Sequence, residues 1–85
     1  MNAYKIEIGE AVRVRKMFFY ETQIAYAGMP SADIYSLVIV NTEAHNSWSF
    51  NLYVPVRKKE IKISKGTIRV VRVYENSVEF EFLKN

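Results

Sequence analysis

The chain has 85 residues, of which 49% are hydrophobic and 25% are charged, and it contains no cysteine. This balance is that of an ordinary folded domain and excludes an intrinsically disordered chain. The length predicts one domain over residues 1–85 with a small core, and the net charge of +3 permits a polyanionic partner without requiring one.

Targeting signals are not evident in the sequence. No apolar run approaches the ~20 residues of a membrane helix, and the first residues lack the apolar region of a signal peptide. Because small secreted domains often carry disulfides, the absence of cysteine favours a reducing compartment. We therefore expect a cytoplasmic protein with no membrane partner.

Apolar and polar residues alternate with a period of two through most of the chain, which predicts strands. Residues 4–8 and 12–15 alternate in this way near the start. A three-residue loop between them would form a hairpin that opposes Ile8 to Val12 and Glu7 to Arg13, so that core residues share one face.

The next segment is the hardest to interpret. Residues 17–20 are apolar at every position, which predicts either burial on both sides or a shift of the pattern by a bulge near Lys16. Residues 21–33 fit a continued strand or, at most, one short helix near residues 21–27. Gly28 and Pro30 then mark a loop.

Two further strands are predicted on either side of a polar loop over 42–47. Residues 34–40 are apolar at most positions, as in a central strand. Between Trp48 and Val56 apolar and polar residues alternate, which predicts a strand with one face in the core. Pro55 cannot donate a ladder hydrogen bond, so it marks an edge or a strand end.

In the last third of the chain, the residue pattern predicts both the strands and the register in which they pair. Residues 61–63, 68–74 and 78–82 form three strands, and a bulge at residues 70–71 corrects a change of parity within the second. With a turn at residues 75–76, apolar residues then face apolar residues and each arginine faces a glutamate, which supports the register. The predicted charge pairs are Arg72 with Glu79 and Arg69 with Glu81.

These patterns together predict an all-β fold. We expect a small antiparallel barrel or sandwich of six or seven strands, connected by meander hairpins.

Catalysis has little support in the sequence. His45 and Glu43 share the 42–47 loop and could form a general base pair, but polar residues at a loop tip are ordinary. No group of residues has metal-ligand spacing, and the glycines do not form a phosphate-binding loop. We therefore expect a protein that is not an enzyme and has no metal or cofactor.

Positive charge gathers between residues 57 and 65, which hold five basic residues and one glutamate. Lysines on a short edge strand would prevent aggregation through that edge. Alternatively, the segment binds nucleic acid, with its basic side chains on phosphates and an outward tyrosine stacked on bases. The candidate polyanion-binding residues are Arg57, Lys58, Lys59, Lys62, Lys65 and Tyr53, to which Arg13, Arg15 and Lys16 could add.

The apolar segments 17–20 and 34–40 suggest one more property. A domain this small has little material with which to cover two apolar faces, although the second layer of a barrel or sandwich would also do so. The leading hypothesis is a non-catalytic interaction module, a self-associating or accessory subunit that binds a homo-oligomeric or other protein partner through an apolar face or a β-edge. The alternative is a nucleic-acid-binding small β-barrel that uses residues 57–65.

Overall fold

The computed structural model describes residues 2–84, which form eight strands and no helix. The strands are β1 (Asn2–Glu7), β2 (Ala11–Met17), β3 (Tyr20–Ser31), β4 (Ile34–Glu43), β5 (Asn46–Pro55), β6 (Glu60–Ile63), β7 (Gly66–Val73) and β8 (Ser77–Lys84). The predicted all-β class is confirmed, with eight strands where six or seven were expected. The short helix considered near residues 21–27 does not form, because this segment lies within the 12-residue strand β3, which also contains Gly28 and Pro30, where a loop was predicted.

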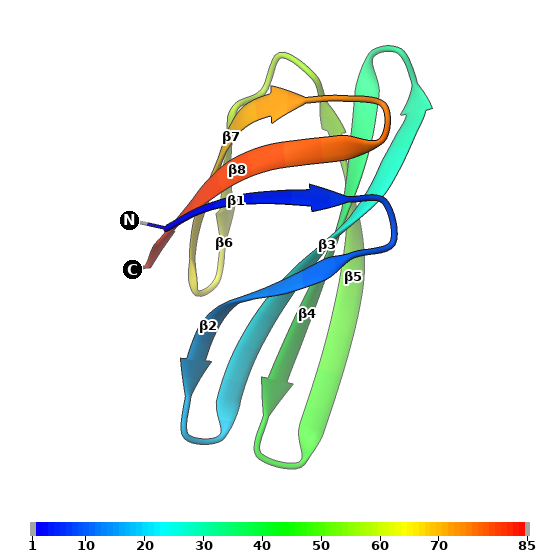
Figure 1. The fold of residues 1–85 in the computed structure, drawn as a ribbon. Helices are drawn as coiled ribbons and strands as arrows, with labels where there is room; N and C mark the ends of the chain where they lie inside the picture. Colours follow the sequence, from blue (N-terminus) through cyan, green and yellow to red (C-terminus); the bar gives the residue numbers. More distant parts are fainter. Residues whose placement is uncertain (1, 85) are drawn as a thin grey trace.

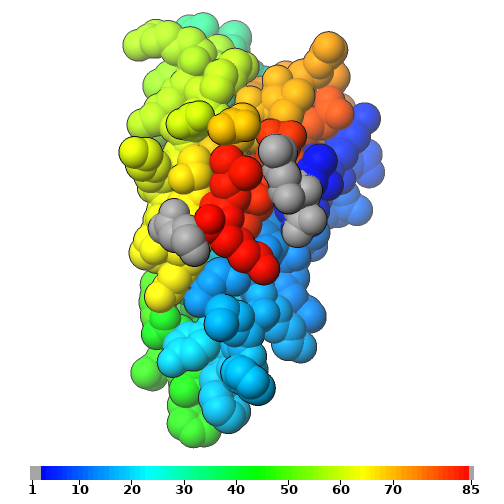
Figure 2. Space-filling model, turned by 90° about the vertical axis from the view of Figure 1, so that its left-hand side faces the viewer, coloured from blue at the N-terminus to red at the C-terminus, as the bar shows by residue number. Residues whose placement is uncertain are grey.

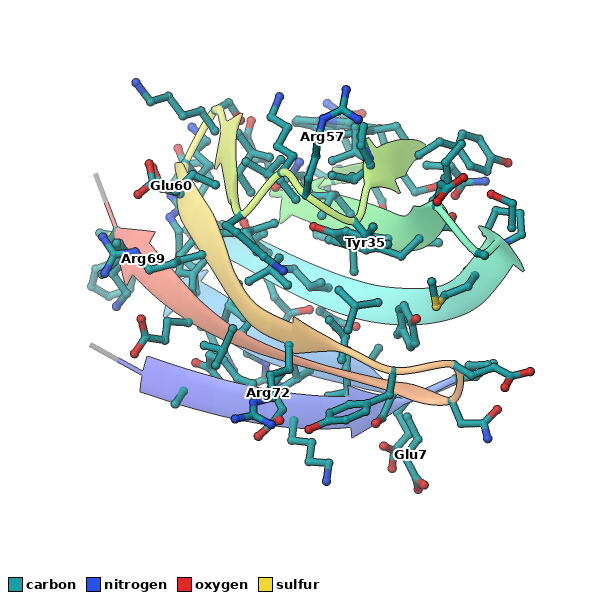
Figure 3. The ribbon with its side chains drawn as sticks, turned by 90° about the horizontal axis from the view of Figure 1, so that it is seen from above. Glu7, Tyr35, Arg57, Glu60, Arg69 and Arg72 are labelled. Carbon is teal, nitrogen blue, oxygen red and sulfur yellow. The ribbon has the colours of Figure 1, made fainter. Side chains whose placement is uncertain are left out.

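The strands form two antiparallel sheets, sheet A in the order β1-β8-β7-β6 and sheet B in the order β2-β3-β4-β5. Figure 1 and Figure 3 show the two sheets as separate layers. Strands that follow each other in the chain are paired except at β1–β2 and β5–β6, and β8 pairs with β1. The fold is therefore a meander in which the first strand pairs with the last. The chain crosses from one sheet to the other at two corners, between β1 and β2 and between β5 and β6.

The predicted hairpin between the first two strands is wrong. β1 pairs with β8, where Lys5 lies opposite Glu79, whereas β2 pairs with β3 in the other sheet. Gly9, with φ of +86°, lies where the chain passes from sheet A to sheet B, and a bridge between Ile8 and Tyr26 closes this corner. The alternation of apolar and polar residues shows which face of a strand is buried. It does not show which strand is the neighbour, because every strand with the same alternation matches equally well.

The predicted register of β7 and β8 is confirmed. The ladder shifts between Val70 and Arg72, as expected for a bulge at residues 70–71, and Arg72 lies opposite Glu79. Arg69 lies opposite Glu81, with its Nη1 3.7 Å from the Glu81 Oε1. Local turn geometry and charge pairing determine this hairpin, so the sequence was sufficient to predict it.

The hydrophobic core lies between the sheets. Two buried tyrosines connect segments that are distant in sequence: the Tyr26 hydroxyl donates to the Tyr74 carbonyl at 2.6 Å and the Tyr35 hydroxyl donates to the Lys58 carbonyl at 3.1 Å. The buried apolar residues are Ile6, Val14, Ile24, Tyr26, Tyr35, Leu37, Ile39, Val54, Ile61, Ile68, Val70, Val78, Phe80 and Phe82.

A polar pair lies among the buried residues of sheet B. Thr22 on β3 is opposite Asn41 on β4, and both are buried. The Thr22 hydroxyl donates to the Asn41 Oδ1 at 2.9 Å, which satisfies an oxygen that would be costly to bury alone.

Thr22→Val is expected to lower the free energy of unfolding by about 1–3 kcal/mol, because it leaves the Asn41 oxygen buried without this donor. The double variant Thr22→Val/Asn41→Leu is expected to recover part of that loss, because no polar group is then left unpaired. Urea denaturation of the single and double variants measures both effects. A double variant whose loss equals the sum of the two single losses would contradict the coupling.

One end of sheet B extends beyond sheet A, as Figure 1 shows from the front and Figure 2 from the side. Phe18 and Phe19 form the β2–β3 turn at this end, between the paired residues Met17 and Tyr20, and they are 94% and 73% exposed. The predicted burial of residues 17–20 on both sides is therefore wrong. The register shift of β2 lies between Arg13 and Arg15, just before the predicted position.

β5 is the predicted strand with alternating apolar residues, but the core covers only part of its apolar face. Val54 is buried and Leu52 half-buried, whereas Phe50 is 38% exposed and Trp48 43% exposed. Exposure thus increases along β5 towards the end of sheet B that projects beyond sheet A.

Candidate functional site

The basic segment lies at the edge of sheet A, beside β5. Residues 57–59 connect β5 to β6, Lys62 belongs to β6, and Lys65 lies in the β6–β7 turn. The predicted edge position is confirmed, because β6 lies at the end of the strand order of sheet A. Figure 3 shows Arg57 on the opposite side of the molecule from Arg72.

Ion pairs within the protein neutralise part of this segment. The Lys65 Nζ lies 3.6 Å from the Glu43 Oε1, and the Glu60 Oε2 lies 3.6 Å from the Arg69 Nε. The segment's single carboxylate is therefore bound from β7. Within residues 2–84, the basic side chains of the segment that form no ion pair are Arg57, Lys58, Lys59 and Lys62.

A groove of about 570 Å³ lies at the corner between β5 and β6. Its apolar lining comes from both sheets, with Phe50 and Leu52 on β5 and Ile61 and Ile63 on β6. Its polar lining comes from Lys58, Glu60 and Lys62. The groove therefore combines an apolar floor with two positive charges that form no ion pair among residues 2–84.

The loop beside this groove is held by backbone groups. The Lys58 amide donates to the Pro55 carbonyl at 2.9 Å, and the Lys59 carbonyl accepts from the Val70 amide at 2.7 Å. The Lys58 carbonyl accepts from the Tyr35 hydroxyl. Burial raises the pKa of Tyr35 to about 12, so this hydroxyl keeps its proton and remains a donor above the pH at which an ordinary tyrosine loses it.

The free edge of β5 presents backbone groups to the corner. The Val56 amide donates to the Asp33 carbonyl at 2.9 Å, which makes these two residues a hydrogen-bonded pair. Bonded and non-bonded pairs alternate along an antiparallel ladder. Ser49, Asn51 and Tyr53 therefore direct their amides and carbonyls away from β4.

β5 differs from the other edge strands of residues 2–84. It has ten residues, no charged side chain and no shift in its register with β4. β6 has only four residues, while β2 carries three basic residues and a register shift. β1 is shorter and carries Lys5 and Glu7. Proteins usually protect their edges by such means or by proline, and β5 has a proline only at its last residue, Pro55. Residues 46–54 of β5 are therefore the least protected edge of the four.

The structure brings together only part of the predicted polyanion-binding set. Lys58 and Lys62 line the groove. Tyr53 is 66% exposed but lies on the opposite face of β5 from the groove residues, because successive side chains of a strand alternate in direction. Residues 13–16 lie on β2, at the opposite edge of sheet B from β5, and Arg13 is paired with Glu21 at 2.8 Å.

The two residues considered for catalysis, Glu43 and His45, lie at the end of β4 and in the turn that follows it. His45 is exposed in the β4–β5 turn, and the Glu43 carboxylate contacts Lys65. In residues 2–84, no three histidine, cysteine, aspartate or glutamate side chains come together in a way that could hold a metal ion. Nor does that part of the chain contain a helix long and apolar enough to span a membrane.

Sequence reasoning assigned Phe50 and Leu52 to the core and missed their place in the groove. The available signal was the absence of charge from residues 46–55, which is unusual for an exposed edge. That signal could not be used without knowing that β5 is an edge, since the position of a strand in its sheet depends on tertiary pairing.

Comparisons of the chain with protein-family models, with curated proteins and with solved structures give no match. The function is therefore inferred from the geometry of the chain itself.

Proposed function

We propose that the protein is a non-catalytic interaction module that binds a protein partner by accepting an extended strand along the edge of β5. The observation that carries this proposal is the long, uncharged and regular β5 edge beside an apolar groove. In strand addition, backbone hydrogen bonds supply affinity, and pockets for alternate side chains supply specificity. The β5 edge offers the first and the groove offers the second.

The geometry of the corner supports an added strand. The Val70–Lys59 hydrogen bond establishes the same alternation for β6, so that Glu60 and Lys62 direct their backbone groups away from β7. Backbone donors and acceptors thus occur on both sides of the corner. A guest strand paired with β5 would cover Phe50 and Leu52 and would extend sheet B towards β6.

Strand addition at β5 is expected to slow the amide hydrogen exchange of Ser49, Asn51 and Tyr53, because these amides would gain hydrogen bonds. The measurement uses a panel of synthetic eight-residue peptides that differ in charge and in apolar pattern, together with the protein alone at high concentration. The proposal requires that at least one peptide, or a second copy of the chain, slows exchange at these three amides.

Asn51→Pro is the variant that tests the mode of binding. Proline removes an amide that β4 does not use, so we expect a change in the free energy of unfolding of less than about 1 kcal/mol, as is tolerated at an edge. Binding is expected to be lost. The matched control Asn51→Thr keeps the amide and is expected to keep binding. If no peptide and no second copy slows the three amides, strand addition at β5 is excluded.

Nucleic-acid binding is the second candidate. Four basic side chains of residues 57–65 form no ion pair within the described part of the chain. They favour this candidate, because such side chains contact phosphates. An apolar groove beside an uncharged strand provides apolar contacts and backbone hydrogen bonds, which a peptide strand can use more fully than a phosphate backbone can. We therefore place this candidate second and include oligonucleotides in the experiment below.

A further inference from the structure

The lining of the groove indicates what kind of strand would fit it. We infer that the partner of β5 is an acidic extended segment in which carboxylate residues alternate with apolar ones. This inference rests on the proposed strand addition and adds the chemistry of the partner.

The apolar half of the pattern comes from the floor of the groove. Phe50 and Leu52 lie two residues apart on β5 and share one face, and Ile61 and Ile63 do the same on β6. A guest strand beside β5 would direct every second side chain to this face. Apolar residues at those positions would remove the exposed part of Phe50 from water, which is favourable in proportion to the area covered.

The acidic half of the pattern comes from the charges around the groove. Lys58 and Lys62 line it without forming an ion pair in the part of the chain that the structure describes. Glu60, which also lines it, is bound to Arg69. The charge left for a guest to meet is therefore positive, and carboxylates on the guest would both neutralise it and steer the encounter.

The protein already pairs a strand of this kind with basic residues. In β8, Val78, Phe80 and Phe82 face the core and alternate with Glu79 and Glu81. β8 pairs with β7, where Arg69 and Arg72 lie opposite the two glutamates. The guest that we infer has the same alternation as β8.

A second copy of this chain fits the corner less well. Its β5 contains no charged residue, so pairing of two β5 strands would place no carboxylate from β5 beside Lys58 or Lys62. Single-stranded nucleic acid would supply the negative charge, and Phe50, 38% exposed on the groove face, offers one ring for stacking with a base. Nucleic acid has no backbone amides and carbonyls with which to extend the ladder of β5, so a peptide strand matches this edge better.

The closing experiment uses four synthetic peptides of eight residues. In the first, three valines alternate with three glutamates between threonine ends. In the second and third, the glutamates are replaced by lysine or by glutamine, and the fourth groups the glutamates and valines into separate blocks. We expect the acidic alternating peptide to bind about tenfold or more tightly than the lysine peptide, to slow the Asn51 amide, and to bind more tightly than the block peptide.

Two variants with the same change in net charge test the role of the groove lysines. Lys58→Glu/Lys62→Glu is expected to reverse the preference, so that the lysine peptide binds better than the acidic one. Lys16→Glu/Lys84→Glu changes two exposed lysines that do not line the groove and is expected to keep the original preference. Thermal melts show whether each variant is folded before affinities are compared.

The possible failures can be told apart. If the glutamine or lysine peptide binds β5 as tightly as the acidic one, or if light scattering shows a dimer that Asn51→Pro disrupts, strand addition stands and the acidic partner is overturned. If random single- or double-stranded oligonucleotides bind at low salt through Lys58 and Lys62 without slowing the Asn51 amide, both are overturned in favour of nucleic acid. If nothing slows the β5 amides, both are overturned.

Discussion

Raising the pH from 10 to 12 is expected to lower the free energy of unfolding by about 2 kcal/mol through Tyr35 alone. Burial, and to a smaller extent the nearby Tyr26, raise the pKa of Tyr35 from 10.0 to about 12. The unfolded chain loses this proton near pH 10, whereas the folded protein holds it until about pH 12. The stabilisation is therefore fully present below pH 10 and is lost as the pH rises through 12.

Tyr35→Phe provides the control for this prediction. It removes the hydrogen bond to the Lys58 carbonyl and is expected to cost about 1 kcal/mol at pH 7. It also removes the titrating group, so its stability should fall less steeply above pH 10. Tyr26, whose pKa is also raised by burial, would account for part of the remaining slope. Urea denaturation between pH 9 and pH 12.5 measures both proteins, and parallel curves would contradict the role of Tyr35.

Gly66→Ala is expected to destabilise the protein by about 3 kcal/mol, because the added methyl group has no space. A Cβ at this position would lie 2.5 Å from the Leu83 carbonyl oxygen and 2.5 Å from the Phe82 Cζ. The first is a backbone atom of the paired strand, and the second belongs to a buried ring. Neither can move without disturbing sheet A, so a melting temperature roughly 10–20 °C lower is expected.

Gly9→Ala is the matched control for steric crowding. A Cβ at Gly9 would meet nothing within 4 Å, but the residue has φ of +86°. The expected cost is the backbone strain alone, about 1 kcal/mol. Thermal melts of the two variants separate the mechanisms. Equal melting temperatures would show that the close approach at Gly66 is relieved by small movements.

The parts of the fold that could be predicted depend on contacts between neighbouring segments. The β7–β8 hairpin was predictable because its turn, its bulge and its opposed charges all support one register. The β1–β8 pair was not predictable. It places Lys5 opposite Glu79, which is distant in the sequence, whereas the hairpin predicted from the sequence paired Glu7 with the nearby Arg13 equally well. Pairing between distant strands leaves no local signal in the sequence.

The β2–β3 turn shows a different limit. Tight turns can usually be recognised in a sequence by glycine or asparagine, which tolerate a positive φ. Here Phe18 has φ of +33°, a conformation that is rare for a bulky residue. A run of large apolar residues therefore resembled a buried strand although it forms an exposed turn.

The candidate site was only partly predictable for the same reason. The excess of positive charge in residues 57–65 is evident from the sequence, and four of these basic side chains form no ion pair with any residue that the structure describes. Neither the Glu43 carboxylate that neutralises Lys65 nor the groove beside Phe50 could be foreseen. Both depend on how the edge of sheet A is placed against the edge of sheet B.

The pairing of β1 with β8 also has a consequence for the order in which the fold is assembled on the ribosome. The hairpins of sheet B connect strands that are adjacent in sequence, so they can form as soon as β5 has been synthesised. β1 is made before them, yet its partner is β8. During most of translation β1 therefore has no partner strand with which to form hydrogen bonds. Long-range pairing of this kind slows folding. We expect sheet B to become protected first and β1 to be the last strand protected in a pulse-labelled refolding experiment.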